Sequence, residues 1–476
     1  MRKGKDMSNH FFTTLSKYCK KDIVPMHMPG HKRNPLCTMP DPYSLDVTEV
    51  PGVDDLHHPV EMIRDLMDEL TKYYDSKQTY LLVNGSTCGI LAAITACCYP
   101  GDKILVARNC HKSVYNAIKL LGLRPVYVVP HRLEGMLGEL GIAGEIEVSE
   151  IRRRLKENPD IKCAMITSPT YEGIVSDIAG IAEAVHEKNI PLIVDEAHGA
   201  HFNWIPTFPE TAVRQGADLV IESLHKTLPA FTQTAVLHQT GNRIDEERLL
   251  WALQTYQSSS PSYLLMASIA KCFEYVKTEE SFSAEHFVKN LNDFYKKTDG
   301  LQKLETVRCE KMDLSKIVIS TARTELTGQQ LEELLLERYG VQLEMSCGNY
   351  ALGMATICDT AEHFDRFAKA LCDLDRSLSY AEKGAKKTFT YNIKPPEQRM
   401  YSHEAERLPK QEILLTEAAG QTAAKDVYLY PPGVPFAVAG EIFSQEMVDV
   451  LLDGQRSGYE VRGVENGRVF VCQEIK

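Results

Sequence analysis

The sequence lacks long apolar runs, and this limits where the protein can act. Residues 1–10 are charged and polar, and no apolar run of the length that a signal peptide needs follows them. The longest mostly apolar stretch, residues 88–100, is too short and too mixed to span a bilayer. We therefore expect a cytoplasmic protein with no membrane partner.

Paired cysteines and an excess of basic residues are also absent. The 13 cysteines are scattered, without CxxC pairs at zinc-ligand spacing, which indicates reduced thiols rather than a disulfide framework. Lys plus Arg number 53 and Asp plus Glu 65, so the formal net charge is −12. That balance lacks the electrostatic footprint of a general nucleic-acid binder. We expect no nucleic-acid partner.

What is present is the composition of a folded globular chain. Of the 476 residues, 43% are hydrophobic and 25% are charged. Residues 1–60 carry seven prolines from Pro25 to Pro59, which favours an extended arm with turns. A helical pattern follows at 59–74. About three structural units after the arm fit this length, at roughly 100–200 residues per domain.

An alternation of short apolar strands and amphipathic helices then begins. We expect strands at 79–83, 103–107, 125–129, 163–167, 191–195 and 219–221, and helices at 87–98, 113–121, 149–157 and 178–188. This order predicts an α/β fold with a mainly parallel sheet that is covered by helices on both faces. Ligands of such sheets bind at the carboxyl ends of the strands.

The pattern changes in the last two fifths of the chain. Residues 281–385 show helices with a few strands, including a helix at 329–339 and a strand at 350–356. A polar stretch at 383–411 has the composition of a linker, and a closing helix is expected near 445–453. We therefore predict an arm (1–60), a large domain (61–280), a small α/β domain (281–385) and a linker with a C-terminal α+β domain (386–476).

The residues after the first strand could hold an anion. Residues 84–89 (NGSTCG) open a helix, and small residues let backbone N–H groups approach a phosphate, with Ser86 and Thr87 as further donors. A plain helix cap would use the same residue types. The segment alone does not decide between the two interpretations.

Asp195 follows the strand at 191–195, with His198 and His201 close behind it. A buried acid is costly unless it meets a cation or a donor. Asp195 could hold a protonated ring nitrogen, DEAH could be a helicase motif, or the two histidines could bind a metal. A helicase needs a GxxxxGK[ST] phosphate loop, which this chain lacks. The metal interpretation has no other support, and we predict no metal.

Lys226 lies in a loop after the strand at 219–221, beside Ser223 and His225. A lysine becomes a nucleophile when desolvation and nearby positive charge lower its pKa. A single lysine is more often a solvated surface residue, and His111 alone is more often a loop histidine. Their order along the chain changes this. A phosphate cup, His111, Asp195 and then Lys226 fit a pyridoxal phosphate (PLP) site with Lys226 as the Schiff-base lysine.

Nine segments in chain order carry a family resemblance. They are MPGHK (28–32), DVTEVPGVDDLHHP (46–59), VNGSTCGILAAI (83–94), RNCHKSVYNAI (108–118), TSPTYEGIVSDI (167–178), VDEAHGAH (194–201), SLHKTLPAFTQTAVLH (223–238), SSSPSYLLMAS (258–268) and YPPGVPFAVAGE (430–441). The chain resembles the bacterial ornithine/lysine/arginine decarboxylases, in a short form without the receiver-like domain of the long enzymes. The resemblance implies the aminotransferase-like fold of type I PLP enzymes.

The resemblance also implies roles for single residues. Lys226 would carry the cofactor, Asp195 would pair with the pyridine nitrogen, and His111 and Ala197 would lie on opposite faces of the ring. His198 would lie near the ring hydroxyl, and either His225 or Lys226 would return a proton to Cα. The implied phosphate contacts are Gly85, Ser86, Thr87, Ser223 and His225, with Ser259 and Ser260 contributed by the neighbouring subunit of a homodimer or higher homo-oligomer.

The implied reaction converts a basic amino acid (arginine, lysine or ornithine) into a polyamine-type amine and CO2. The cationic end of such a substrate needs an acid, for which Glu441, Asp54 and Asp55 are candidates. Two alternatives remain open from the sequence. One is another activity of the same superfamily, as an aminotransferase or lyase, and the other is a non-catalytic PLP-binding relative.

Overall fold

The computed structural model describes residues 7–34, 39–381, 396–430, 434–456 and 460–473. Its centre is a seven-stranded sheet in the order β2-β8-β7-β6-β5-β3-β4. β8 runs antiparallel to both of its neighbours, and the other pairs in the sheet are parallel. The strands are β2 (Gln78–Leu82), β3 (Lys103–Ala107), β4 (Arg124–Val128), β5 (Ile161–Thr167), β6 (Leu192–Asp195), β7 (Leu219–Glu222) and β8 (Ala235–Gln239).

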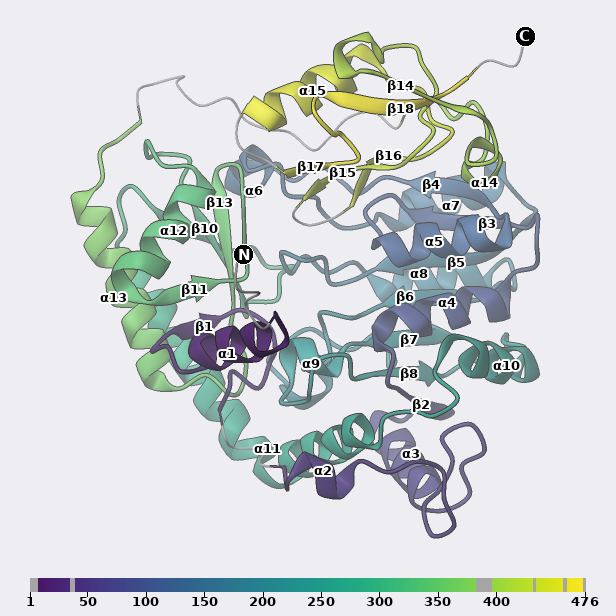
Figure 1. Cartoon of the computed structure of the whole chain (residues 1–476), viewed down its shortest axis with the longest axis horizontal. Coiled ribbons are helices and arrows are strands. Elements are labelled where there is room, and N and C mark those ends of the chain that lie inside the picture. The colour runs from purple at the N-terminus through teal and green to yellow at the C-terminus, as the bar shows by residue number, and fades with distance from the viewer. Residues whose placement is uncertain (1–6, 35–38, 382–395, 431–433, 457–459, 474–476) are drawn as a thin grey trace, which may run out of the picture.

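Helices cover both faces of this sheet (Figure 1). α4 (Gly85–Cys97) packs against α5 (Lys112–Leu121) and α10 (Glu246–Tyr256), while α7 (Val148–Glu157) packs against α8 (Ile178–His186). The central strands are apolar along their length because neither face meets water. The predicted α/β fold with a mainly parallel sheet is confirmed, and the strands and helices expected between 79 and 221 occur within two residues of their predicted bounds.

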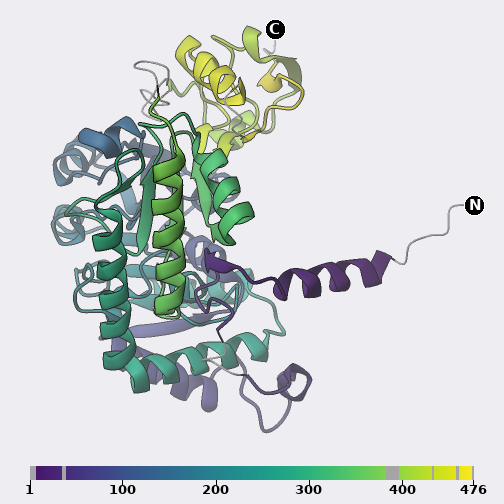
Figure 2. The ribbon, with the colours of Figure 1, turned by 90° about the vertical axis from the view of Figure 1, so that its left-hand side faces the viewer.

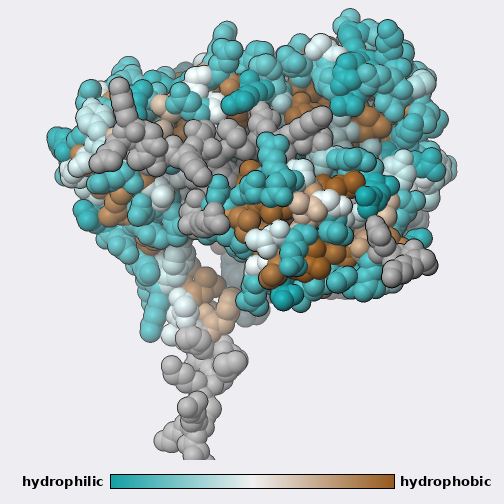
Figure 3. All heavy atoms as spheres, turned by 90° about the horizontal axis from the view of Figure 1, so that it is seen from above, coloured by the Kyte–Doolittle hydropathy of each residue, from teal (hydrophilic) through white to brown (hydrophobic). Residues whose placement is uncertain are grey.

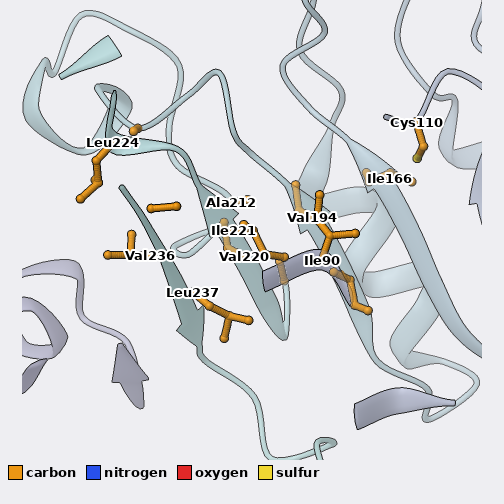
Figure 4. Packing of buried hydrophobic residues seen from close by; sticks show 14 of the residues in the cluster. Ile90, Cys110, Ile166, Val194, Ala212, Val220, Ile221, Leu224, Val236 and Leu237 are labelled. Atoms are coloured by element: carbon orange, nitrogen blue, oxygen red, sulfur yellow. The ribbon is translucent and has the colours of Figure 1, made fainter. Parts of the chain in front are cut away.

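The core of this large unit joins the sheet to its helices. Figure 4 shows part of it, with Val194 from β6, Ile221 from β7, Leu237 from β8 and Ile90 from α4. A Cβ atom at Gly89 would come within 2.6 Å of the Leu82 side chain, so glycine lets the second turn of α4 lie directly against the sheet. This contact fixes the start of α4 at the carboxyl end of the strands.

A second, small unit follows the long helix α11 (Tyr263–Thr298). Its four-stranded antiparallel sheet has the order β12-β13-β10-β9. The strands are β9 (Glu305–Val307), β10 (Lys316–Ser320), β12 (Met345–Cys347) and β13 (Tyr350–Met354), and the helices are α12 (Gly328–Tyr339) and α13 (Ala361–Ser377). Position 280, where we predicted a domain boundary, falls inside α11. The domain bounds therefore stay predictions.

The C-terminal unit has a hydrophobic core of its own and lies at the top of Figure 1. It contains the strand pair β14-β18 and the three-stranded sheet β16-β15-β17. Its elements are α14 (Ser402–Ala405), β14 (Lys410–Leu414), β15 (Val427–Tyr430), β16 (Pro435–Ala437), α15 (Gln445–Arg456), β17 (Glu460–Arg462) and β18 (Arg468–Cys472). Residues 383–395 of the predicted linker lie outside the described residues, and the rest of it holds α14 and the start of β14.

The N-terminal segment differs from the extended arm that we predicted. Residues 7–19 form helix α1, which projects from the body of the molecule in Figure 2. No proline occurs before Pro25, so nothing in this stretch interrupts a helix. The segment then runs through β1 (Val24–Met26), which pairs with β11 (Val341–Leu343) of the small unit, and α2 (Pro42–Leu45).

The helices and the surface of the protein are consistent with the lack of long apolar runs in the sequence. Among the described residues, every helix is too short or too polar to cross a lipid bilayer. The face seen in Figure 3 is covered mainly by hydrophilic residues, with apolar patches between them.

Candidate active site

A cavity of about 560 Å³ lies at the carboxyl ends of the strands, between the large, small and C-terminal units. Six residues that we singled out from the sequence line it: Ser86, His111, Asp195, Ala197, His198 and Lys226. They come from the loops after β2, β3, β6 and β7. The parallel sheet brings these loops to one edge, as the strand pattern predicts.

Lys226 lies in the short helix α9 (Leu224–Thr227), directly after β7. Its Nζ is 3.0 Å from Nε2 of His198. Desolvation by the surrounding protein lowers the pKa of Lys226, and the charge of Lys316 lowers it further, whereas Asp195 acts in the opposite direction. The site therefore makes the neutral amine, the nucleophilic form of lysine, easier to reach than it is in water.

Asp195 ends β6 and is almost fully buried. Its Oδ1 accepts a hydrogen bond of 3.2 Å from the backbone N–H of Ala197. Burial raises the pKa of Asp195, while Lys226 and this hydrogen bond oppose the rise. A cation placed in the cavity beside Asp195 would stabilise the ionised carboxylate.

The two cavity histidines are held in their neutral forms. His111 is the N-cap of α5, where its Nδ1 lies 2.8 Å from Oγ of Ser113. Desolvation, together with the charges of Lys226 and Lys112, lowers the pKa of His111 to about 4. Desolvation and the charge of Lys226 also lower the pKa of His198. Both rings can therefore contact a ligand without carrying positive charge at neutral pH.

The predicted anion contacts surround the start of α4 and the loop before α9. Gly85 adopts a φ of +74° that favours glycine, and its N–H donates to the carbonyl of Gln233. Ser86 lines the cavity, whereas Thr87 is exposed beside it. The Ser223 hydroxyl is buried without a hydrogen-bond partner in the described part of the chain. An unpartnered buried hydroxyl here suits a ligand oxygen.

His225 and the distant serines take different positions. Nδ1 of His225 donates to the carbonyl of Thr234 at 2.9 Å, so this ring is anchored to the neighbouring loop. Ser259 and Ser260 are exposed, and neither lines the cavity. The structure thus leaves these two serines accessible on the surface of the chain.

The three acids predicted for the substrate are not among the residues that line the cavity. Asp54 accepts hydrogen bonds from the backbone N–H groups of Val60 and Ile63, and so organises its own loop. Asp55 accepts from the N–H of His57. Glu441 forms an ion pair with Arg108 instead.

Other acids that the sequence reasoning missed do line the cavity. Glu172 follows β5, is buried, and accepts a hydrogen bond of 2.9 Å from the hydroxyl of Tyr350. Asp426 reaches the cavity from the C-terminal unit and pairs with Lys119 at 2.7 Å. Glu172 could have been found, because it lies just after a predicted strand, whereas nothing local marks Asp426 or Tyr350.

His198 and His201, which the sequence offered as a metal pair, have different partners. Nε2 of His198 faces Lys226, whereas Nε2 of His201 lies 3.3 Å from Oδ2 of Asp313 in the small unit. The two rings thus contact different residues, Lys226 and Asp313, rather than a shared point between them.

Comparison with protein families decides the identity. The family described as "Orn/Lys/Arg decarboxylase, major domain" matches residues 9–321, and "Orn/Lys/Arg decarboxylase, C-terminal domain" matches residues 383–466. The chain belongs to the Orn/Lys/Arg decarboxylase family. The resemblance inferred from the sequence segments is confirmed, and the chain is an enzyme of the decarboxylase type.

Individual relatives of this decarboxylase agree with the family. An arginine decarboxylase of Bacillus subtilis is 30% identical over 99% of each chain. The constitutive lysine decarboxylase of E. coli has a similar fold, with a TM-score of 0.76 and 18% identity over 98% of this chain and 82% of that one. An L-threonine transaldolase from Pseudomonas fluorescens in its internal aldimine state shares the fold more distantly, with a TM-score of 0.59 and 14% identity over 78% and 87% of the two chains.

Proposed function

We propose that this decarboxylase uses PLP to convert a basic amino acid, arginine, lysine or ornithine, into the corresponding amine and CO2. The observation that carries the proposal is that Lys226 and Asp195 line the same cavity and influence each other's charge. The cavity offers a lysine whose pKa is lowered and an acid whose pKa is raised by burial. These are the two groups that a PLP enzyme needs for the aldehyde and the ring nitrogen.

The residues of the cavity fit this cofactor. Next to the cavity lining, the Ser223 and Thr227 hydroxyls are buried without partners in the described residues; Ser223 is the N-cap and Thr227 the last residue of the helix that carries Lys226. Together with Ser86 at the N-terminus of the 13-residue helix α4, they provide donors for a phosphate. Asp195 offers a buried carboxylate for a protonated nitrogen, and the neutral ring of His111 offers a flat surface.

When bound, PLP supplies a conjugated ring that accepts the electron pair left at Cα after CO2 departs. Asp195 would keep the ring nitrogen of bound PLP protonated, because opposite charges attract strongly at a poorly solvated site. His198 holds the amine of Lys226 in place at 3.0 Å. We propose that Lys226 or His225 then delivers the proton that Cα needs.

The far end of a basic substrate carries a positive charge, and we propose Glu172 as its partner. Burial raises the pKa of Glu172, and the hydrogen bond from Tyr350 only partly offsets this rise. A substrate ammonium or guanidinium group would stabilise the charged carboxylate. Asp426 is a weaker candidate, because it already pairs with Lys119.

We also propose that the enzyme acts as a homodimer with shared active sites. Ser259 and Ser260 are exposed at the start of the SSSPSY segment, where the family resemblance implies phosphate contacts to a neighbouring subunit. Their accessible position on the single chain is compatible with that role.

Two measurements test the proposed function. Borohydride reduction of the PLP-loaded protein, followed by peptide mapping, should label Lys226; a label on another residue, or none, contradicts the proposal. Incubation with each of the three amino acids should release CO2 and one amine. A keto-acid product would favour an aminotransferase instead, and PLP binding without turnover would favour a non-catalytic relative.

A further inference from the structure

Lys316 and Asp313 of the small unit form a buried charged cluster, which contacts the loop after β6. Lys316 starts β10, and its side chain is completely buried. Its Nζ lies 3.3 Å from Oδ2 of Asp313, whose side chain is also completely buried. An ion pair taken wholly out of water is expensive to form, so its stability alone does not explain its presence.

This cluster contacts the loop after β6 at two points. Nζ of Lys316 donates to the backbone carbonyl of His198 at 3.4 Å. Oδ2 of Asp313 lies 3.3 Å from Nε2 of His201, one turn further along the loop. The segment that contains His198 is therefore held from the small unit at its start and at its end.

The same cluster is locked in place by its neighbours. Oδ1 of Asp313 accepts hydrogen bonds from the hydroxyl and the N–H of Ser315, at 2.7 and 2.9 Å. The stem of Lys316 packs over Gly173, where a Cβ atom would come within 2.9 Å of the lysine Cγ. Burial would raise the pKa of Asp313, but Lys316, His201 and Ser315 hold it below its usual range. The carboxylate therefore stays charged opposite Lys316.

His198 in turn contacts Lys226, with 3.0 Å between Nε2 and Nζ. We propose that Lys316 is a positioning residue, which holds His198 against Lys226 and presents a fixed positive charge to that amine from the small unit. The inference rests on the proposed role of Lys226. It adds that the reactivity of this lysine depends on a residue of another structural unit.

The charge of Lys316 acts on Lys226 together with other groups. Asp195 and Glu344 favour the protonated amine, and Lys316 favours the neutral one. The neighbouring rings of His111 and His198 are neutral near pH 7, since desolvation lowers their pKa values. Removing Lys316 would take away a positive charge that opposes protonation, so Lys226 would lose its proton at a higher pH.

The test measures how fast PLP attaches to Lys226 in cofactor-free protein as a function of pH. Attachment needs the neutral amine, so the pH at the midpoint of the rate profile reports the protonation of Lys226. Lys316→Met keeps the aliphatic stem over Gly173 and removes the charge. We expect its midpoint to rise by about one pH unit, which makes attachment about tenfold slower at neutral pH.

A second variant covers the case in which Lys316→Met does not fold. Lys316→Met combined with Asp313→Asn leaves no unpaired buried charge and should show the same upward shift. Lys311→Met is the matched control, because Lys311 lies five residues before Lys316 and its exposed side chain forms an ion pair with Glu145. Its midpoint should equal that of the unchanged protein.

The outcomes separate the two proposals. A folded double variant with an unchanged midpoint overturns the positioning role of Lys316. Failure of PLP to attach to Lys226 in the unchanged protein overturns the proposed function instead. A shift in the double variant, absent in the control, supports the inference.

Discussion

Arg108 and Glu441 form an ion pair of 3.0 Å that joins the large unit to the C-terminal unit. The Glu441 side chain is 2% exposed, and the same oxygen, Oε2, also accepts a hydrogen bond from the N–H of Val438. Arg108 also donates to the carbonyl of Pro435. A sequence motif that suggested a substrate contact thus lies at the junction of two units.

Glu441→Gln should therefore lower stability. The change leaves the guanidinium of Arg108 buried without a counter-charge, and losing one partner of such a pair costs about 3–5 kcal/mol. Chemical denaturation would measure the loss, and Arg108→Met together with Glu441→Gln should recover part of it. A raised KM for one basic amino acid at unchanged stability would instead support the substrate role predicted from sequence.

Asp195→Asn should retain PLP and lose most turnover. A neutral amide cannot favour a protonated ring nitrogen, and loss of an opposite charge shifts such a pKa by about 1–3 units, so the rate should fall about 10- to 1,000-fold. Steady-state CO2 release and the visible absorbance of the bound cofactor measure the two effects. Asp177→Asn is the control, since Asp177 caps α8 outside the cavity and Asn caps equally well. Normal turnover in Asp195→Asn would contradict the assignment.

Glu172→Gln should weaken substrate binding. A hydrogen bond to a charged group contributes about 1.5–3 kcal/mol, so KM for the preferred amino acid should rise at least about tenfold. Glu183→Gln, in which an exposed side chain of α8 changes in the same way, is the matched control. If KM stays constant in Glu172→Gln but rises in Asp426→Asn, the cationic end of the substrate lies toward the C-terminal unit.

The protein should become less stable as the pH falls from 7 to 5. His238 is completely buried, and desolvation lowers its pKa to about 3, whereas an unfolded histidine titrates near 6.5. The unfolded state therefore binds more protons over this range, and stability rises with pH. One such histidine contributes about 2 kcal/mol between pH 5 and pH 7.

Urea denaturation of cofactor-free protein at the two pH values measures this effect. His238→Gln removes the titrating group, and its amide can still reach Thr79, which lies 2.8 Å from Nδ1 of His238. The variant should lose about 2 kcal/mol less than the unchanged protein on acidification. Equal losses in both proteins would show that other groups dominate.

Sequence patterns predicted the large unit well for a physical reason. Apolar strands buried on both faces are easy to recognise, and in a parallel sheet their ends meet, so Asp195 and Lys226 could be placed together before any coordinates were known. Contacts between units join residues that are far apart in the sequence, so no local sequence pattern predicts them. Glu172 and Tyr350 are 178 positions apart, and Arg108 and Glu441 are 333 positions apart. Helix α1 was missed because the prolines that suggested an extended arm all come after it.

Helix α11 connects the two units that meet where Lys316 contacts the backbone carbonyl of His198. It comprises 36 residues and leads from the large unit into the small one, with a bend between its two halves (Figure 2). Since the chain passes between the two units through this helix, a change in the angle between them would move the contact of Lys316 with the His198 carbonyl, and with it the ring that faces Lys226.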